Sequence, residues 1–201
     1  MLTLFHAPQS RSTRILTLIE EMGAADKITL RPVDIIRADG TGARDHANPH
    51  PDAKVPALDH DGTLVTESGA VMLYLTDLFP SPLAPVQGDA KRGAFLTWLF
   101  WYGSVMEPVM ILSGAGLDHP WLAKTYRGMP EITARLQSAL SRGPWLLGDT
   151  FTAADILIQS PFHWFKDAIP DDPLIRDWLA RGAARPAYQR VMQAEAQRRA
   201  A

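Results

Sequence analysis

Three prolines stand within the six residues Pro80–Pro85, between two stretches of very different pattern. Such a cluster continues neither a helix nor a strand, so it is typical of a linker. A chain of 201 residues is long enough for one large domain or two small ones. We therefore predict one domain over residues 1–80 and a second over residues 86–201.

The stretch before the prolines predicts a mixture of strands and helices. Residues 2–5 and 28–33 read as strands, and between them Ile15, Leu18, Ile19 and Met22 form one helical stripe. A strand, a helix and a strand within about 33 residues imply a βαβ unit with parallel strands.

A polar loop is expected over residues 39–54. Residues 56–58 and 63–65 then predict a hairpin, because Asp61-Gly62 is a turn signal between two short apolar runs. A helix over residues 68–79 completes this half of the chain.

Every periodic segment beyond the prolines is helical. The first runs from residue 89 to 111 and contains Pro108, which predicts a break near residue 104. Further helices are predicted over residues 119–141, from residue 151, over 174–181 and over 186–199. The residues Thr152-Ala153-Ala154-Asp155 predict a capping box at the start of the third helix, for which a structural role is favoured over a catalytic one.

Composition excludes several classes of function. The net charge of −2 and the pI of about 6.3 give no electrostatic case for binding nucleic acid or an anionic membrane surface. No apolar run reaches the ~20 residues of a membrane helix. The chain has no cysteine, which excludes disulfides, cysteine-ligated zinc and a cysteine nucleophile. We expect a cytoplasmic protein, since a secretory signal is also not visible.

Ser10 lies between the first strand and the first helix, where the helix dipole is positive. A hydroxyl there can donate to a ligand thiolate, and a charge-assisted hydrogen bond contributes about 1.5–3 kcal/mol. The alternative is that Ser10 or Ser12 caps the helix. The residues alone favour neither interpretation.

Glu67 and Ser68 fall in the first turn of the helix after the hairpin, where free N–H groups attract anions. They can hold the charged end of a ligand, although helix capping by Thr66 or Ser68 is the stronger interpretation when this turn is taken alone. Pro56 enters the hairpin after Val55. The sequence alone favours a trans bond, because about 5–6% of such bonds are cis in folded proteins.

Two other groups of side chains have weaker claims to a function. His46 and His50 have a spacing compatible with zinc on a helix, but Pro49 and Pro51 disrupt such a helix and no third ligand is evident, so we expect no metal. Tyr102 and Met106 belong to an aromatic segment that is mostly core, and they are candidates for lining an apolar pocket.

The order and spacing of several motifs resemble the cytosolic glutathione transferase family of bacterial type, along nearly the whole chain. The matching segments are LTLF with SRSTR at residues 2–5 and 10–14, Asn48-Pro49, KVPAL at 54–58, ESGAVMLYL at 67–75 and FTAADI at 151–156. The resemblance implies an α/β thioredoxin-like N-terminal domain and an all-α helical C-terminal domain, usually in a homodimer. It also implies a cis bond before Pro56.

Matching positions then imply specific roles. Val55 pairs with the cysteinyl backbone of glutathione, Glu67 and Ser68 hold its γ-glutamyl end, and Lys54 lies near the glycyl carboxylate. Ser10 matches the serine that activates the thiol, although a slip in the alignment leaves Arg11 or Ser12 as competitors. The segment before Lys54 is longer than is usual in the family.

The resemblance predicts an enzyme that adds the glutathione thiolate to a small, hydrophobic electrophile near Tyr102 and Met106, with a role in detoxification. It also implies that glutathione is the co-substrate and that no metal is needed. Two alternatives stay open: a non-catalytic binding or scaffold protein of the same fold, and a glutathione-dependent isomerase, dehalogenase or peroxidase.

Overall fold

The computed structural model describes residues 1–200, which form two compact units. Unit 1 comprises Met1–Ser81 together with Ala184–Ala201, and unit 2 comprises Pro82–Ala183. The sequence assigned residues 184–201 to the helical domain, whereas their contacts assign them to unit 1. Residue 201, the last of the predicted second domain, lies outside the described residues.

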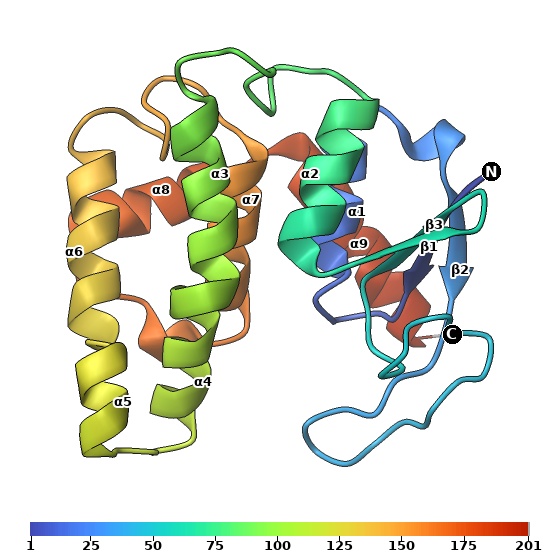
Figure 1. Cartoon of the computed structure of the whole chain (residues 1–201), viewed down its shortest axis with the longest axis horizontal. Helices are drawn as coiled ribbons and strands as arrows, with labels where there is room; N and C mark the ends of the chain where they lie inside the picture. Colours follow the sequence, from blue (N-terminus) through green and yellow to red (C-terminus); the bar gives the residue numbers. More distant parts are fainter. Residues whose placement is uncertain (201) are drawn as a thin grey trace. The chain divides into compact units, whose positions relative to one another are not determined.

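A four-stranded sheet in the order β2-β1-β3-β4 forms the centre of unit 1 (Figure 1). The strands are β1 (Leu2–His6), β2 (Thr29–Pro32), β3 (Ala57–His60) and β4 (Thr63–Thr66). β1 and β2 are parallel, and β3 pairs antiparallel with both β1 and β4. The predicted βαβ unit and hairpin are therefore confirmed.

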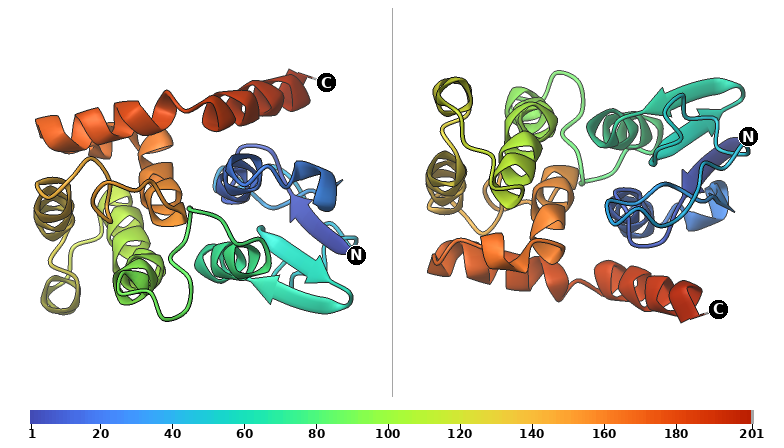
Figure 2. Two further views of the ribbon diagram at one scale, coloured as in Figure 1. Left: turned by 90° about the horizontal axis from the view of Figure 1, so that it is seen from above. Right: turned by 90° about the horizontal axis from the view of Figure 1, so that it is seen from below.

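Helices α1 (Thr13–Glu21) and α2 (Ser68–Leu78) cover one face of this sheet, and α9 (Pro186–Ala200) runs alongside α1 (Figure 2). A short 3-10 helix, η1, spans Ala25–Lys27. Side chains alternate between the faces of a strand, so Leu4 and His6 share one face of β1 and Phe5 lies on the other. Phe5 packs there in a small cluster with Val33 and Val55.

Unit 2 is helical, as predicted. Its elements are α3 (Arg92–Trp101), the π-helix η2 (Tyr102–Met106), α4 (Glu107–Gly114), α5 (Pro120–Thr125), α6 (Met129–Leu140), α7 (Ala153–Gln159), the 3-10 helices η3 (Ser160–His163) and η4 (Lys166–Ala168), and α8 (Pro173–Ala183). The expected disturbance near residue 104 is confirmed as the π-helical turn, since Pro108 cannot donate a backbone hydrogen bond. The capping box of Thr152 and Asp155 is confirmed as well.

The single helix predicted over residues 119–141 is wrong. The chain leaves α5 at Tyr126 and begins α6 after Gly128, whose φ of 81° is incompatible with a continuing helix. Pro130 lies in the first turn of α6, where its missing N–H costs nothing.

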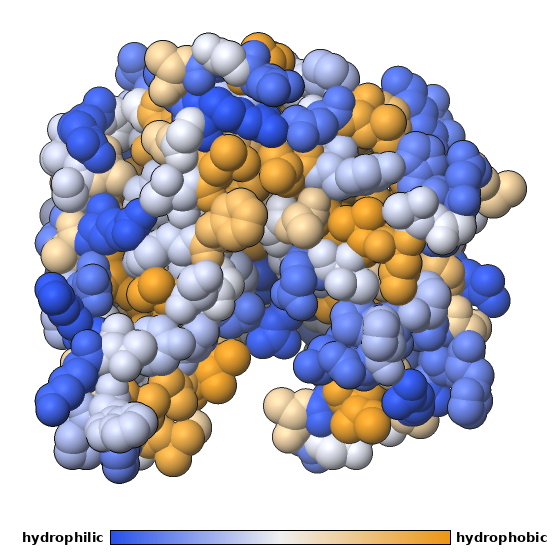
Figure 3. All heavy atoms as spheres, in the orientation of Figure 1, coloured by the Kyte–Doolittle hydropathy of each residue, from blue (hydrophilic) through white to orange (hydrophobic). Residues whose placement is uncertain are grey.

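The surface of unit 2 carries some apolar side chains. Figure 3 shows them gathered where α4 ends, and Ile111 and Leu117 are 46% and 60% exposed. The helical segment Arg92–Gly114 is 23 residues long and contains an 18-residue stretch with a mean hydropathy of 1.3. Among residues 1–200 it alone has the length and composition of a membrane span, a property that core helices of soluble proteins share.

Candidate functional site

Strand register brings the predicted ligand residues of unit 1 to one end of the sheet. Phe5 near the end of β1 pairs with Ala57 at the start of β3, and Ala57 pairs with Thr66 at the end of β4. The segments that follow β1, precede β3 and follow β4 therefore leave the sheet at the same end. They carry Ser10, then Lys54 to Pro56, then Glu67 and Ser68 respectively.

The bond between Val55 and Pro56 is cis, which confirms the expectation that rested on the family resemblance. The Val55 side chain is buried, but within residues 1–200 its backbone N–H and C=O form no hydrogen bond. Asn48 supports the loop before it, because its Nδ2 donates to the Lys54 carbonyl at 3.0 Å and its Oδ1 accepts from the His50 N–H at 3.0 Å. A backbone N–H and C=O without partners on a loop of fixed conformation can bind an extended peptide.

Glu67 precedes α2 with a φ of 67°, in the left-handed region that side chains rarely adopt. Such residues concentrate at ligand sites. The Glu67 side chain is exposed, and neither it nor the Ser68 hydroxyl has a hydrogen-bond partner in the described part of the chain. Lys54 is also exposed, 3.8 Å from Asp52. Two charged side chains and a helix N-terminus are thus available at this end of the sheet.

Ser10 is half-buried in the turn between β1 and α1. Its Oγ donates to the Ala7 carbonyl at 2.7 Å, accepts from the Ser12 N–H at 3.2 Å, and lies 2.8 Å from the Ser12 Oγ. Ser12 is wholly buried, and its side chain makes no capping bond to α1. Ser12 occupies the N-cap position of α1, but its hydroxyl contacts the His6 Nδ1 at 2.7 Å instead of capping the helix.

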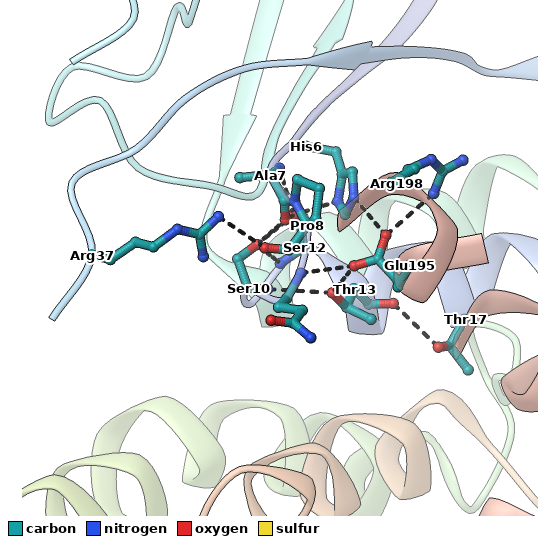
Figure 4. A network of polar contacts seen from close by, with 11 residues as sticks. His6, Ala7, Pro8, Ser10, Ser12, Thr13, Thr17, Arg37, Glu195 and Arg198 are labelled. Atoms are coloured by element: carbon teal, nitrogen blue, oxygen red, sulfur yellow. Dashed lines mark hydrogen bonds and ion pairs between the residues drawn. The ribbon is translucent and has the colours of Figure 1, made fainter. Parts of the chain in front are cut away.

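A buried polar network, which the sequence analysis missed, lies behind this turn (Figure 4). Glu195 of α9, 1% exposed, points into the turn. Its Oε1 lies 2.9 Å from the His6 Nε2, and its Oε2 accepts from the Gln9 N–H and the Thr13 Oγ1, each at 2.8 Å. Arg198 also donates to Oε1, at 3.2 Å.

Burial alone would raise the pKa of Glu195. The hydrogen bonds from His6, Gln9 and Thr13 and the charge of His6 outweigh it and lower this pKa to about 2. The Glu195 carboxylate is therefore ionised at neutral pH. No local motif marks Glu195, because His6, Gln9 and Thr13 lie more than 180 residues away from it in the chain.

A positively charged side chain from the loop after β2 also contacts the turn. Arg37 Nη2 donates to the Pro8 carbonyl at 3.1 Å (Figure 4). Arg11, a predicted competitor of Ser10, is exposed.

The remaining candidate residues occupy different surroundings. Tyr102 and Met106 lie in η2 and are 3% and 0% exposed, and the Tyr102 hydroxyl donates to Glu107 at 2.9 Å. His50 accepts the Asp52 N–H in a turn at 3.1 Å. Over residues 1–200 no group of three histidine or acidic side chains is placed to hold a metal ion.

Comparison with known proteins identifies the relatives of this chain. Residues 1–77 match the glutathione S-transferase N-terminal domain. The chain is 29% identical to the glutathione S-transferase GstA of Escherichia coli O157:H7, over 96% of this chain and 98% of the relative. The crystal structure of a glutathione transferase from Methylococcus capsulatus has a TM-score of 0.75 at 28% identity, covering 98% and 100% of the two chains. These likenesses, which run along nearly the whole chain, support its placement with the cytosolic glutathione transferases.

Two further relatives bear on the chemistry of the chain. It is 28% identical to the disulfide-bond oxidoreductase YfcG of Escherichia coli K12, over 93% of this chain and 92% of the relative. A sphingomonad glutathione S-transferase, solved in complex with glutathione, has a TM-score of 0.76 at 27% identity, covering 96% and 98% of the chains. The thioredoxin-like and helical parts predicted from the sequence are confirmed.

Proposed function

We propose that this chain binds glutathione at the end of its sheet and adds the glutathione thiolate to a small, hydrophobic electrophile. One observation carries the proposal: the backbone groups of Val55 and the side chains of Glu67 and Ser68, which have no hydrogen-bond partner within the described chain, lie on segments at the same end of the sheet as Ser10. A tripeptide with a charged end and a thiol matches that set of groups. The glutathione complex of the sphingomonad relative supports the choice of ligand.

Each residue has a separate task in this proposal. Val55 exchanges two backbone hydrogen bonds with the cysteinyl residue, as an added strand does. Glu67 pairs with the ammonium of the γ-glutamyl group, while Ser68 and the first N–H groups of α2 bind its carboxylate. Lys54 neutralises the glycyl carboxylate.

Ser10 is the group proposed to stabilise the thiolate. Ser10 is half-buried in the turn, whereas Ser12 is wholly buried against His6 and Arg11 is exposed. Lowering a thiol pKa from ~8.5 by about two units requires about 2.7 kcal/mol. A charge-assisted bond of about 1.5–3 kcal/mol, together with the N-terminus of α1, is sufficient.

A second candidate is reduction of a disulfide by glutathione, favoured by the likeness to the oxidoreductase YfcG. The glutathione thiolate attacks one sulfur of the disulfide and expels the other as a thiolate, and a second glutathione resolves the mixed disulfide. Because this chain has no cysteine, both electrons come from glutathione. The same Ser10 contact serves either reaction.

The test combines binding with two activities. We expect calorimetry to detect glutathione binding, and wild type to conjugate a chloronitroarene faster than it reduces hydroxyethyl disulfide. Ser10→Ala removes most of the faster activity, whereas Ser141→Ala, an exposed serine of unit 2, retains it. Absence of glutathione binding overturns the proposal, and binding without either activity favours a scaffold protein.

Three expectations from the sequence remain predictions. Tyr102 and Met106 are proposed to contact the electrophile, which requires these buried side chains to move. The chain is also proposed to act as a homodimer and in the cytoplasm, where glutathione is reduced.

A further inference from the structure

The carboxylate of Glu195 is connected to the Ser10 hydroxyl through two intervening side chains. The successive contacts are Glu195 to His6 at 2.9 Å, His6 to Ser12 at 2.7 Å, and Ser12 to Ser10 at 2.8 Å. The first three side chains are at most 1% exposed, and Ser10 alone is half-buried. The chain of contacts therefore runs from the interior to the proposed thiol site.

The ionised carboxylate fixes one end of this chain. A carboxylate only accepts hydrogen bonds, so the His6 Nε2 carries a hydrogen and donates it to Glu195. Arg198, also on α9, donates to the same Glu195 oxygen. From α1 and the turn before it, Ser12 hydrogen-bonds to His6 and Thr13 donates to Glu195, and both of these side chains are uncharged.

The state of the other ring nitrogen decides which way the hydroxyl hydrogens point. If Nδ1 has no hydrogen, Ser12 donates to it, and Ser10 finds acceptors inside the turn at the Ser12 Oγ and the Ala7 carbonyl. If Nδ1 carries a hydrogen, it donates to Ser12, and the Ser12 hydroxyl then donates to the Ser10 Oγ. The Ser10 oxygen receives a second donor from the Ser12 N–H, and its own hydrogen is left for Ala7 or for an anion.

We propose that Glu195 holds His6 as an imidazolium, which turns the hydroxyls of Ser12 and Ser10 outward so that Ser10 donates to the bound thiolate. Glu195, His6 and Ser12 act as positioning residues, since none of them contacts the thiol. A thiolate displaces the Ala7 carbonyl as the acceptor, because a charged acceptor forms the stronger bond. This inference rests on the proposed function.

Two variants interrupt the chain of contacts at different points. Glu195→Gln removes the anion while keeping the shape of the side chain, and Ser12→Ala removes the link between His6 and Ser10. The matched control is Glu21→Gln, because Glu21 is also a largely buried carboxylate joining α1 to the α9 segment, through Arg185 at 2.6 Å. Over residues 1–200, Glu21 makes no hydrogen bond or ion pair with Glu195, His6, Ser12 or Ser10.

The measurement is the pKa of the glutathione thiol in the complex, read from thiolate absorbance against pH. We expect Glu195→Gln and Ser12→Ala each to raise this pKa by about one unit, equal to a ~10-fold loss in kcat/KM below it. Glu21→Gln keeps the wild-type value. Nitrogen chemical shifts of His6 in the complex should indicate two N–H groups in wild type and one in Glu195→Gln.

The outcomes separate this inference from the proposed function. Binding of glutathione with an unchanged thiol pKa in both Glu195→Gln and Ser12→Ala overturns the inference alone. No binding by wild type overturns the proposed function and this inference together. A neutral His6 in the wild-type complex overturns the inference even when the variants lose activity.

Discussion

Each of the two units contains a carboxylate that is at most 1% exposed, and the comparison between them separates a structural from a functional arrangement. Asp155 in unit 2 is 0% exposed and Glu195 in unit 1 is 1% exposed. Asp155 accepts from the Leu146 N–H and the Trp178 Nε1 at 2.9 Å, and from both donors of Thr152. Glu195 likewise accepts from several donors.

The partners differ in kind. Every donor to Asp155 is a neutral group that keeps its hydrogen at any physiological pH. Glu195 contacts His6 and Arg198, and through His6 it reaches a half-exposed hydroxyl. Burial therefore raises the pKa of Asp155 against its hydrogen bonds, whereas the pKa of Glu195 is lowered to about 2. A buried carboxylate is a functional candidate when its network contains a titratable group and reaches a ligand site.

Asp155→Ala is the change with the largest expected effect on folding. It leaves the N–H groups of Leu146, Thr152 and Trp178 without their acceptor, and each unsatisfied buried donor costs about 1–3 kcal/mol. We expect unit 2 to lose about 4 kcal/mol of stability in urea unfolding, with Asp155→Asn losing less. A loss below about 1 kcal/mol for the alanine variant would mean that water replaces the carboxylate.

For the other carboxylate, Glu195→Gln is tested by measuring the free energy of unfolding as a function of pH. A pKa lowered from 4.5 to about 2 contributes stability that is present above pH ~4.5 and disappears as pH falls toward 2. The shift corresponds to about 3 kcal/mol at neutral pH. The difference in unfolding free energy between wild type and Glu195→Gln should therefore be largest near pH 7 and shrink in acid.

The sign of the Asp155 contribution is opposite. Its folded pKa lies above the unfolded value, so its titration favours the folded state in acid, and that contribution is lost as pH rises through the folded pKa. The difference in unfolding free energy between wild type and Asp155→Asn should therefore be largest in acid and shrink as the pH rises. The same trend for both carboxylates would contradict the distinction drawn between them.

Sequence and structure agree where the signal is local. Asp155 was predicted as a cap because Thr152 stands three residues before it, and the hairpin followed from Asp61-Gly62. The break between α5 and α6 also had a local signal, Gly128, and the prediction of one helix over residues 119–141 did not take it into account. Glu195 had no such signal, because its role depends on α9 packing against α1, and a glutamate on a polar helix is usually solvated.

Gly182→Ala tests the packing beside the hydrogen bonds that join Gln159, Trp178 and Asp155. A Cβ at Gly182 would lie 1.9 Å from the Gln159 Oε1. The Gln159 amide donates to the Trp178 carbonyl at 2.8 Å, and the Trp178 indole donates to Asp155. Displacing the amide should cost unit 2 about 2 kcal/mol through overpacking and one lost hydrogen bond.

The control for this variant is Gly103→Ala, since a Cβ at Gly103 meets nothing within 4 Å. Trp178 fluorescence should change in Gly182→Ala and not in Gly103→Ala. A wild-type spectrum and stability for Gly182→Ala would show that Gln159 rotates away without affecting Trp178.

Glu21→Gln has the smallest expected effect and isolates packing from chemistry at the α9 segment. Arg185 donates two hydrogen bonds to Glu21, of 2.6 and 2.7 Å. Because Arg185 is partly exposed, water and salt screen the attraction between the two charges. We expect a loss of about 1 kcal/mol in unfolding free energy, smaller at high salt. Because Glu21 stabilises the same segment that carries Glu195, equal effects of Glu21→Gln and Glu195→Gln on the bound thiol pKa would show that α9 acts on Ser10 through packing rather than through His6.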